Sequence, residues 1–355
     1  MEFRRRPAKL SVSVFGAALV LTAASACSSS NSSDDSTAGA AGTGGAATKI
    51  CVDYPRSDTD FWNSYITYVP KFATELGVDL DATNSQNDVQ KLIANVQACE
   101  SQGTQAIVMA PQDTAAIAPT LDQLATKKIP VVTIDTRPDS GSAYMVVRAD
   151  NLSYGQQACA FLGEQMKGTG SVVELMGGQD SINGRDRRQG FGDCMAAKYP
   201  GIVVHEEASE WKGDLAASQL QTALAADPDV HGVYMHSSFG LAGTIQVLKQ
   251  AGLTAPAGDP KHVFVVSNDG IPQELQDIRD GTIDATVSQP ADLFAKYGLY
   301  YAKAAVDGKT FKAGPTDHDS TIIEVRPGLL EDDLAAPLVT KENVDDKSLW
   351  GNNAG

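Results

Sequence analysis

The sequence contains few of the residues and motifs on which metal, redox, nucleotide and nucleic-acid chemistry depend. Its 355 residues include five cysteines and five histidines, with no Cys-x-x-Cys pair and no His-x-x-x-His pair, so we expect no metal site and no dithiol redox centre. Neither a Gly-x-Gly-x-x-Gly turn nor a Gly-x-x-x-x-Gly-Lys-Ser/Thr loop is present, which disfavours a nucleotide cofactor. A net charge of −16 disfavours nucleic acid, whose phosphates bind Lys and Arg. We therefore expect a protein with no enzymatic activity, no cofactor and no nucleic-acid partner.

The N-terminus has the features of an export signal. Met1–Lys9 is basic, and Leu10–Ala26 is apolar, short for a membrane-spanning helix, and ends in small residues. Ala24-Ser25-Ala26-Cys27 resembles the lipobox of bacterial lipoproteins, in which the cysteine receives a lipid. The alternative is ordinary cleavage with Cys27 unmodified. We expect 1–26 to be a lipoprotein signal peptide.

The composition of residues 27–48 predicts a flexible polar tether. They are almost wholly Ser, Gly, Ala, Thr, Asn and Asp, which cannot bury enough apolar surface to fold. Such a tether after a lipidated Cys27 would hold a folded part at a distance from the bilayer. We expect an exported protein anchored to the outer face of the cell membrane by Cys27.

Strand-length apolar runs alternate with segments of helical spacing along the rest of the chain. Short apolar runs flanked by turn residues indicate buried parallel strands, and apolar residues three and four apart indicate amphipathic helices. This alternation predicts an α/β fold with parallel sheets. The runs are Ile50–Tyr54, Ala106–Ala110, Val131–Ile134, Ser171–Met176, Gly232–Met235 and Val263–Ser267. The helical segments include Asp88–Cys99, Ala115–Ala125 and Leu241–Ala251. Pro70 is expected to kink or end an earlier helix.

The strand–helix series occurs twice, which predicts two similar lobes. A strand over Ala143–Arg148 closes the first series, and a helix opens at Asp150-Asn151. The second series begins at Ser171. We expect two doubly wound lobes joined near Asp150.

Four cysteines lie outside the N-terminal segments, and export permits disulfides between them. Four cysteines can pair in three ways. The lobe assignment places Cys51 and Cys99 in one lobe and Cys159 and Cys194 in the other. We predict the bridges Cys51–Cys99 and Cys159–Cys194, and the alternative is four buried thiols.

Aromatic and polar residues follow several predicted strands, at the edge where open α/β sheets bind ligands. These groups are Ser57–Trp62, Asp135–Arg137, Asn183–Arg185 and Asn268–Gly270. Aromatic faces pack on C–H patches, carboxylates accept hydrogen bonds from hydroxyls, and Arg and amide side chains donate them. This mixture is typical of a site for a neutral polyhydroxyl ligand.

Short motifs occur in a characteristic order along the folded part. They are Asp58-Thr59-Asp60-Phe61-Trp62, Ser85-Gln86-Asn87-Asp88, Asp135 at a strand end, Arg185-Asp186-Arg187 with Gly190-Phe191, Trp211, Asp269-Gly270 and Gln289. From about Ile50 to Val325 the chain resembles the ribose-binding group of type I periplasmic binding proteins. The resemblance departs at Ala110 and Ser237, where that group has Asn, and at Thr136, where it has Arg beside the ligand aspartate.

The resemblance implies a solute-binding component that delivers a small sugar or polyol to an ATP-binding-cassette (ABC) permease. It also implies three crossing strands, near Asp150, near Gln289 and near Ser320–Ile322. Lobe one would then comprise 49–149 and 290–319, lobe two 150–289 and 320–340, with a tail over 341–355. The departures leave the sugar open, although a pentose or short polyol is favoured over a disaccharide. We expect a monomer.

The ligand-binding residues that the resemblance and the strand ends together predict come from both lobes. They are Asp58, Asp60, Phe61, Trp62, Asp135, Arg137, Arg185, Trp211, Ser238, Phe239, Asp269 and Gln289. Simpler interpretations exist for each kind. The carboxylates can be helix caps, the aromatic residues can be core, and Arg185 can be a surface charge. The same fold also serves as a ligand-binding receptor in chemosensory or signalling systems, which is the alternative function.

Overall fold

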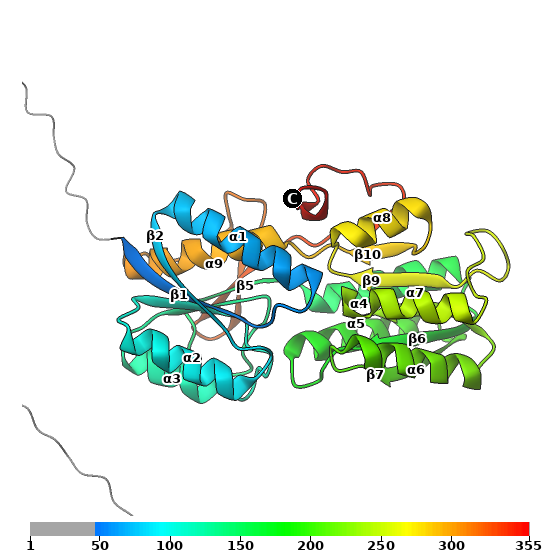
Figure 1. Ribbon diagram of the computed structural model, residues 1–355, viewed down its shortest axis with the longest axis horizontal. Coiled ribbons are helices and arrows are strands. Elements are labelled where there is room, and N and C mark those ends of the chain that lie inside the picture. Colours follow the sequence, from blue (N-terminus) through cyan, green and yellow to red (C-terminus); the bar gives the residue numbers. More distant parts are fainter. Residues whose placement is uncertain (1–46, 355) are drawn as a thin grey trace, which may run out of the picture. The chain divides into compact units, whose positions relative to one another are not determined.

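The computed structural model describes residues 47–354, which form two α/β lobes (Figure 1). The predicted signal peptide, Cys27 and most of the tether lie outside the described residues. Among the described helices, none is both long and apolar enough to cross a membrane.

Lobe one is built on an eight-stranded sheet with helices on both faces. The strand order is β11-β12-β13-β5-β4-β3-β1-β2. Helices α1 and α9 pack against each other, and α9 also packs on β1, β3 and β4, whereas α2 packs on β1 and β2 (Figure 1). The strands are β1 Thr48–Tyr54, β2 Val78–Asn84, β3 Ala106–Met109, β4 Val131–Ile134, β5 Met145–Ala149, β11 Gly314–Pro315, β12 Thr321–Arg326 and β13 Leu329–Leu334. The helices are α1 Asp60–Leu76, α2 Val89–Ser101, α3 Ala118–Thr126 and α9 Ala291–Val306.

Lobe two repeats this plan on a six-stranded sheet. The strand order is β14-β10-β9-β8-β6-β7, in which all neighbours are parallel except β14 and β10. The strands are β6 Gly170–Met176, β7 Ile202–Ala208, β8 Val230–Met235, β9 Phe264–Asn268, β10 Ala285–Val287 and β14 Leu338–Thr340. The helices are α4 Asn151–Gln165, α5 Ile182–Lys198, α6 Gly213–Ala226, α7 Leu241–Gln250 and α8 Pro272–Asp280, with short 3-10 turns η1 Ser238–Gly240 and η2 Trp350–Asn352.

The chain crosses between the lobes three times, and the third crossing differs from the sequence prediction. Crossings between β5 and α4 and between β10 and α9 agree with those expected near Asp150 and Gln289. The third was placed near Ser320–Ile322, but β12 and β13 extend the sheet of lobe one, with β13 parallel to β5. The chain crosses only at 335–337, after which β14 joins the sheet of lobe two. The assignment of 320–334 to lobe two was therefore wrong.

Side chains near the helix starts explain where several helices begin. Thr59, Asp88, Asp150 and Ser181 each accept a backbone N–H of the following turn, at the starts of α1, α2, α4 and α5. Helix α1 runs through Pro70 to Leu76, so Pro70 does not end it, and the expected alternative, a kink, stays a prediction. Its last turn closes at Gly77, whose φ of 64° suits glycine.

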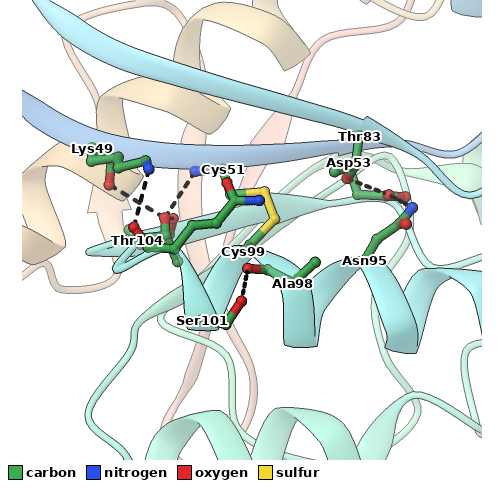
Figure 2. Close-up of a disulfide and its surroundings, with 11 residues drawn as sticks. Lys49, Cys51, Asp53, Thr83, Asn95, Ala98, Cys99, Ser101 and Thr104 are labelled. Carbon is green, nitrogen blue, oxygen red and sulfur yellow. Dashed lines mark hydrogen bonds between the residues drawn. A yellow bond between two sulfur atoms is a disulfide. The ribbon is translucent and has the colours of Figure 1, made fainter. Parts of the chain in front are cut away.

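The four cysteines of the folded part lie in pairs, one pair in each lobe. Cys51 on β1 meets Cys99 on α2 (Figure 2), and Cys159 on α4 meets Cys194 on α5. The Cα–Cα distances are 6.0 and 6.1 Å. These separations suit disulfide bonds. Among the described residues, one group of metal-type side chains lies close together, and it consists of this first pair with Asp81.

Candidate functional site

A cavity lies between the lobes, beyond the carboxyl ends of the strands of both sheets. The cavity is small and is lined by residues of both lobes. Its lining mixes aromatic rings, amides, hydroxyls, one carboxylate and two guanidinium groups. The lining residues are Arg56, Thr59, Phe61, Trp62, Gln112, Asp135, Ser181, Asn183, Arg187, Trp211, Ser237, Phe239 and Gln289.

Aromatic side chains bound the cavity from both lobes. Phe61 and Trp62, in the first turn of α1, are buried and meet edge to face with ring centroids 5.2 Å apart. In lobe two, Trp211 and Phe239 meet at 5.9 Å in the same geometry. The structure therefore brings together the four predicted aromatic residues, and each lines the cavity.

Asp135 projects into the cavity from the end of β4. It is 5% exposed and has φ 61°, a left-handed conformation that non-glycine residues rarely adopt. Its Oδ2 accepts the side-chain amide of Asn183, from α5 of lobe two, at 3.0 Å. It caps no helix, because no helix begins within the next ten residues, so the helix-cap interpretation is wrong for Asp135.

Asp269 occupies the corresponding place at the end of β9 in lobe two. It is fully buried, and its Oδ2 accepts Ser237 Oγ at 2.6 Å and the backbone N–H of Ser238 at 2.8 Å. Gln289, in the second crossing, donates to Oδ1 at 2.6 Å. Helix α8 is preceded by Ile271, so Asp269 does not cap it. The carboxylate lies directly behind Ser237 and Gln289, which line the cavity.

Arg187 on α5 supplies a buried cation between the two aspartates. Its side chain is 2% exposed, and its Nε donates to Asn151 at 2.7 Å and Nη1 to the carbonyl of His236. Nη2 donates to Gln289 Oε1 at 3.3 Å. The guanidinium also lies over the ring of Trp211, 5.6 Å from its centroid. It is therefore held in one orientation at the cavity wall.

Burial dominates the electrostatics of the two aspartates. It raises the pKa of Asp135 to about 6, although Arg187 and Arg148 oppose the shift. Burial also raises the pKa of Asp269, against Arg187 and the hydrogen bonds from Ser237 and Ser238. The site thus holds two strong acceptors whose desolvation the nearby guanidinium groups only partly offset. A ligand that donates hydroxyl hydrogens would reach Asp135, which lines the cavity, whereas Asp269 lies behind Ser237 and Gln289.

Arg185 differs from its predicted position, because it does not line the cavity. Its Nη2 contacts the carboxylate of Asp139 at 2.5 Å and Thr114 Oγ1 at 3.2 Å, both in lobe one. Its Nη1 donates to the carbonyl of Gln179 at 3.0 Å. Arg185 therefore joins the two lobes at the margin of the cavity. The guanidinium that faces the cavity belongs to Arg187, one helical half-turn along α5.

Four further predicted residues lie beside the cavity rather than in its wall. Asp58 and Asp60 are exposed, and Asp58 pairs with Arg56 at 2.5 Å, which lowers its pKa. Arg137 pairs with Glu331 of β13 at 3.2 Å. Ser238 lines a neighbouring groove with Asp58 and Asp60, while its Oγ donates to Asp269 at 2.6 Å.

Sequence reasoning missed several lining residues, some of which had a detectable signal. Gln112 and Ser237 follow β3 and β8, so their place at strand ends would have identified them. Arg56 lies two residues before the motif 58–62, and its Nη1 donates across the cavity to the carbonyl of Trp211 at 3.2 Å. Nothing in the local pattern distinguishes Arg187 from Arg185.

Comparison with known proteins places the chain among solute-binding proteins. A family described as periplasmic binding protein domain matches residues 50–310. The ribose import binding protein of Bacillus subtilis is 26% identical over 241 residues, 68% of this chain and 76% of that protein. The xylitol-binding protein of Mycolicibacterium smegmatis is 26% identical, covering 77% of this chain and 72% of that protein. An ABC transporter solute-binding protein of Mycobacterium smegmatis with bound glycerol superimposes with a TM-score of 0.72 at 25% identity, covering 84% of this chain and 96% of that one.

Proposed function

Because the chain belongs to the periplasmic binding protein family, we propose that it is the extracytoplasmic solute-binding component of an ABC importer, binding a small sugar or short polyol between its lobes. Its relatives are substrate-binding transport proteins rather than enzymes. The observation that carries the proposal is the buried chain of Arg187, Gln289 and Asp269 at the cavity wall.

This chain of hydrogen bonds favours a neutral ligand rich in hydroxyls. Guanidinium groups lie close to both carboxylates, because Arg187 and Arg148 lower the pKa of Asp135 and Arg187 lowers that of Asp269, so neither carboxylate is isolated to pair with an ionic ligand. Hydrogen bonds to charged groups contribute about 1.5–3 kcal/mol each when desolvated. The rings of Trp62 and Trp211 offer faces or edges to the C–H groups of the same ligand. Together these groups suit a sugar or polyol.

Ligand size is supported by the small cavity and by the relatives. The small cavity leaves little room for a second sugar ring. Xylitol and ribose, named for the two relatives above, are both five-carbon compounds, and glycerol is a three-carbon polyol. A pentose or a short polyol is therefore the ligand class that we propose.

Hinge closure would couple binding to recognition by the permease. The three crossings join the lobes, and several pairs of side chains meet across the cleft, including Asn183 with Asp135 and Arg185 with Asp139. A ligand that contacts Asp135 of lobe one and Arg187 of lobe two makes both sets of hydrogen bonds only when the lobes meet, so binding would favour the closed arrangement. The permease would then recognise the protein with its lobes closed.

Location and covalent state complete the proposal. We infer that residues 1–26 direct export, that Cys27 carries the lipid anchor and that 27–48 is the tether. In an exported protein the pairs Cys51–Cys99 and Cys159–Cys194 would be oxidised to disulfides, which their Cα distances permit. We expect a monomer.

Thermal unfolding of the purified protein against a panel of compounds tests the function. The panel comprises D-ribose, D-allose, L-arabinose, xylitol, glycerol, amino acids and nucleosides. A ligand that binds only the folded state stabilises it by about 2.7 kcal/mol at a hundredfold excess over its Kd. We expect a shift with a pentose or polyol and none with the amino acids. A shift with an amino acid or nucleoside alone would overturn the ligand class.

A further inference from the structure

The C-terminal segment 343–354 contacts a residue of the cavity wall, Phe61, through Trp350. This tryptophan is 3% exposed and lies in η2, which packs on α8 of lobe two. Its indole Nε1 donates to the backbone carbonyl of Asp269 at 3.1 Å. Its ring also meets that of Phe61, from lobe one, edge to face with centroids 6.0 Å apart. Trp350 thus contacts Phe61, which lines the cavity, and the backbone of Asp269, whose buried carboxylate lies behind the cavity wall.

The segment that carries Trp350 is fixed to lobe two. Arg279 on α8 donates to the carboxylate of Asp345 at 2.8 Å and to the side chain of Asn352 at 2.7 Å. Beside Trp350, Gly351 lies so close to the Asp269 turn that an added Cβ would stand 2.2 Å from the carbonyl oxygen of Gly270. The segment is therefore packed directly beneath this turn.

The backbone that Trp350 contacts has an unusual conformation. Asp269 has φ 127° and Gly270 has φ 74°. L-residues rarely adopt positive φ, and such conformations persist only where surrounding groups hold them. The side chain of Asp269 is held by Ser238 and Gln289, whereas its carbonyl is held by Trp350. The indole N–H therefore fixes the peptide whose orientation directs the carboxylate toward Ser237 and Gln289.

We propose that Trp350 is a positioning residue of the ligand site, and that the segment predicted as a tail completes the cleft. Its N–H group holds the Asp269 turn, and its ring sets the position of Phe61 from the opposite lobe. The proposal rests on the sugar-binding function proposed above. A residue that only packs the core would need no more than the volume of the indole. The role proposed for Trp350 also requires its hydrogen bond to the carbonyl of Asp269.

Trp350→Phe tests this distinction, since it keeps a ring against Phe61 and removes the donor. The matched control is Tyr301→Phe in lobe one, which also removes one buried donor, to Asp332 at 3.1 Å, and does not line the cavity. Titration calorimetry with xylitol and D-ribose should show an affinity lowered about threefold to tenfold in Trp350→Phe and unchanged in Tyr301→Phe. Equal affinity in both variants would overturn the proposal. Failure of the unmodified protein to bind any sugar or polyol would instead overturn the proposed function.

Hydrogen exchange on the unmodified protein gives a second test that needs no variant. The amides of Asn352 and Asn353 bond to the carbonyls of Leu349 and Trp350, at 3.0 and 2.8 Å, and so report the opening of η2. Addition of the bound sugar or polyol should slow their exchange together with that of α5. Protection of α5 without any change in η2 would contradict a role for Trp350 in the site.

Discussion

Arg187 Nη2 donates to Gln289 Oε1 at 3.3 Å, and Gln289 Nε2 donates to Asp269 Oδ1 at 2.6 Å. A helix of lobe two, a crossing segment and a strand end of lobe two are thereby connected in one buried line. Because each group has a partner before a ligand arrives, the wall is set in position rather than assembled during binding.

Removal of Arg187 should abolish most of the binding. Hydrogen bonds to a charged group contribute about 1.5–3 kcal/mol when desolvated, so Arg187→Ala should weaken affinity by about tenfold or more. Titration calorimetry with the ligand found in the panel measures this. Arg188→Ala is the matched control, since this neighbour is exposed and pairs with Glu206 at 2.6 Å. Equal affinity of Arg187→Ala and Arg188→Ala would mean that the cavity wall is not the ligand site.

Arg185 should affect closure rather than ligand contact. It pairs with Asp139 across the lobes, and both side chains are about one third exposed. Such pairs contribute about 0.2–1 kcal/mol, so Arg185→Ala and Asp139→Ala should each weaken affinity by no more than about fivefold. The double variant should lose no more ligand affinity than the more affected single variant, because both substitutions remove the same ion pair. The loss of affinity should be smaller in high salt, which screens this pair. Strictly additive losses in stopped-flow dissociation rates would contradict this pairing.

The pH dependence of binding should follow Asp135. Its pKa is raised from 3.8 to about 6 by burial, so between these values the folded protein binds more protons than the unfolded chain. The contribution of Asp135 to the free energy of unfolding therefore falls as pH rises through this window. Ligand affinity should change in the opposite direction, because the ionised carboxylate is the stronger acceptor for hydroxyls.

Comparison with Asp135→Asn separates this group from the other carboxyls. Between pH 4 and 7, unfolding midpoints and ligand affinities of the variant should lack the opposing trends of the unmodified protein. If both proteins change in parallel with pH, the titrating group is another residue.

The cysteine pairs should stabilise each lobe separately. The paired cysteines are 48 and 35 positions apart in the sequence, and closing loops of this size contributes about 2–4 kcal/mol each. Cys159→Ala with Cys194→Ala should therefore lower the unfolding midpoint while ligand affinity stays near that of the unmodified protein. Mass spectrometry after alkylation of the unreduced protein checks the pairing itself. Alkylation of all four thiols in the unfolded protein would contradict it.

Much of the architecture could be predicted because parallel strands buried on both faces have a strong signal. β3 and β4 are continuous apolar runs with every residue buried. β2 and β7 were missed because they are edge strands, at the ends of their sheets, and carry charged residues within the strand. β2 alternates apolar with acidic residues over 78–81, and β7 holds His205, Glu206 and Glu207. The lobe of β12 and β13 could not be predicted, since strand pairing alone decides it.

The site could be predicted to the level of elements but not of every side chain. Strand ends identified Asp135, Asp269 and the Phe61–Trp62 pair because parallel sheets bring these ends together. Arg185 and Arg187 both lie on α5, two residues apart. Only the orientation of the helix determines that Arg185 contacts the other lobe whereas Arg187 lines the cavity. Trp350 had no signal, because its contacts come from folding of the C-terminal segment onto α8.

Tryptophan fluorescence tests the central claim most directly. The three tryptophans of the chain are Trp62, Trp211 and Trp350; the first two line the cavity, and the third contacts Phe61 and Asp269. Titration of the purified protein with xylitol, D-ribose and L-arabinose should change the emission saturably with one of them, at one ligand per chain, and Arg187→Ala should remove this response. An emission spectrum that no sugar or polyol changes, together with an unfolding midpoint that none of them raises, would contradict a sugar-binding cleft between the lobes.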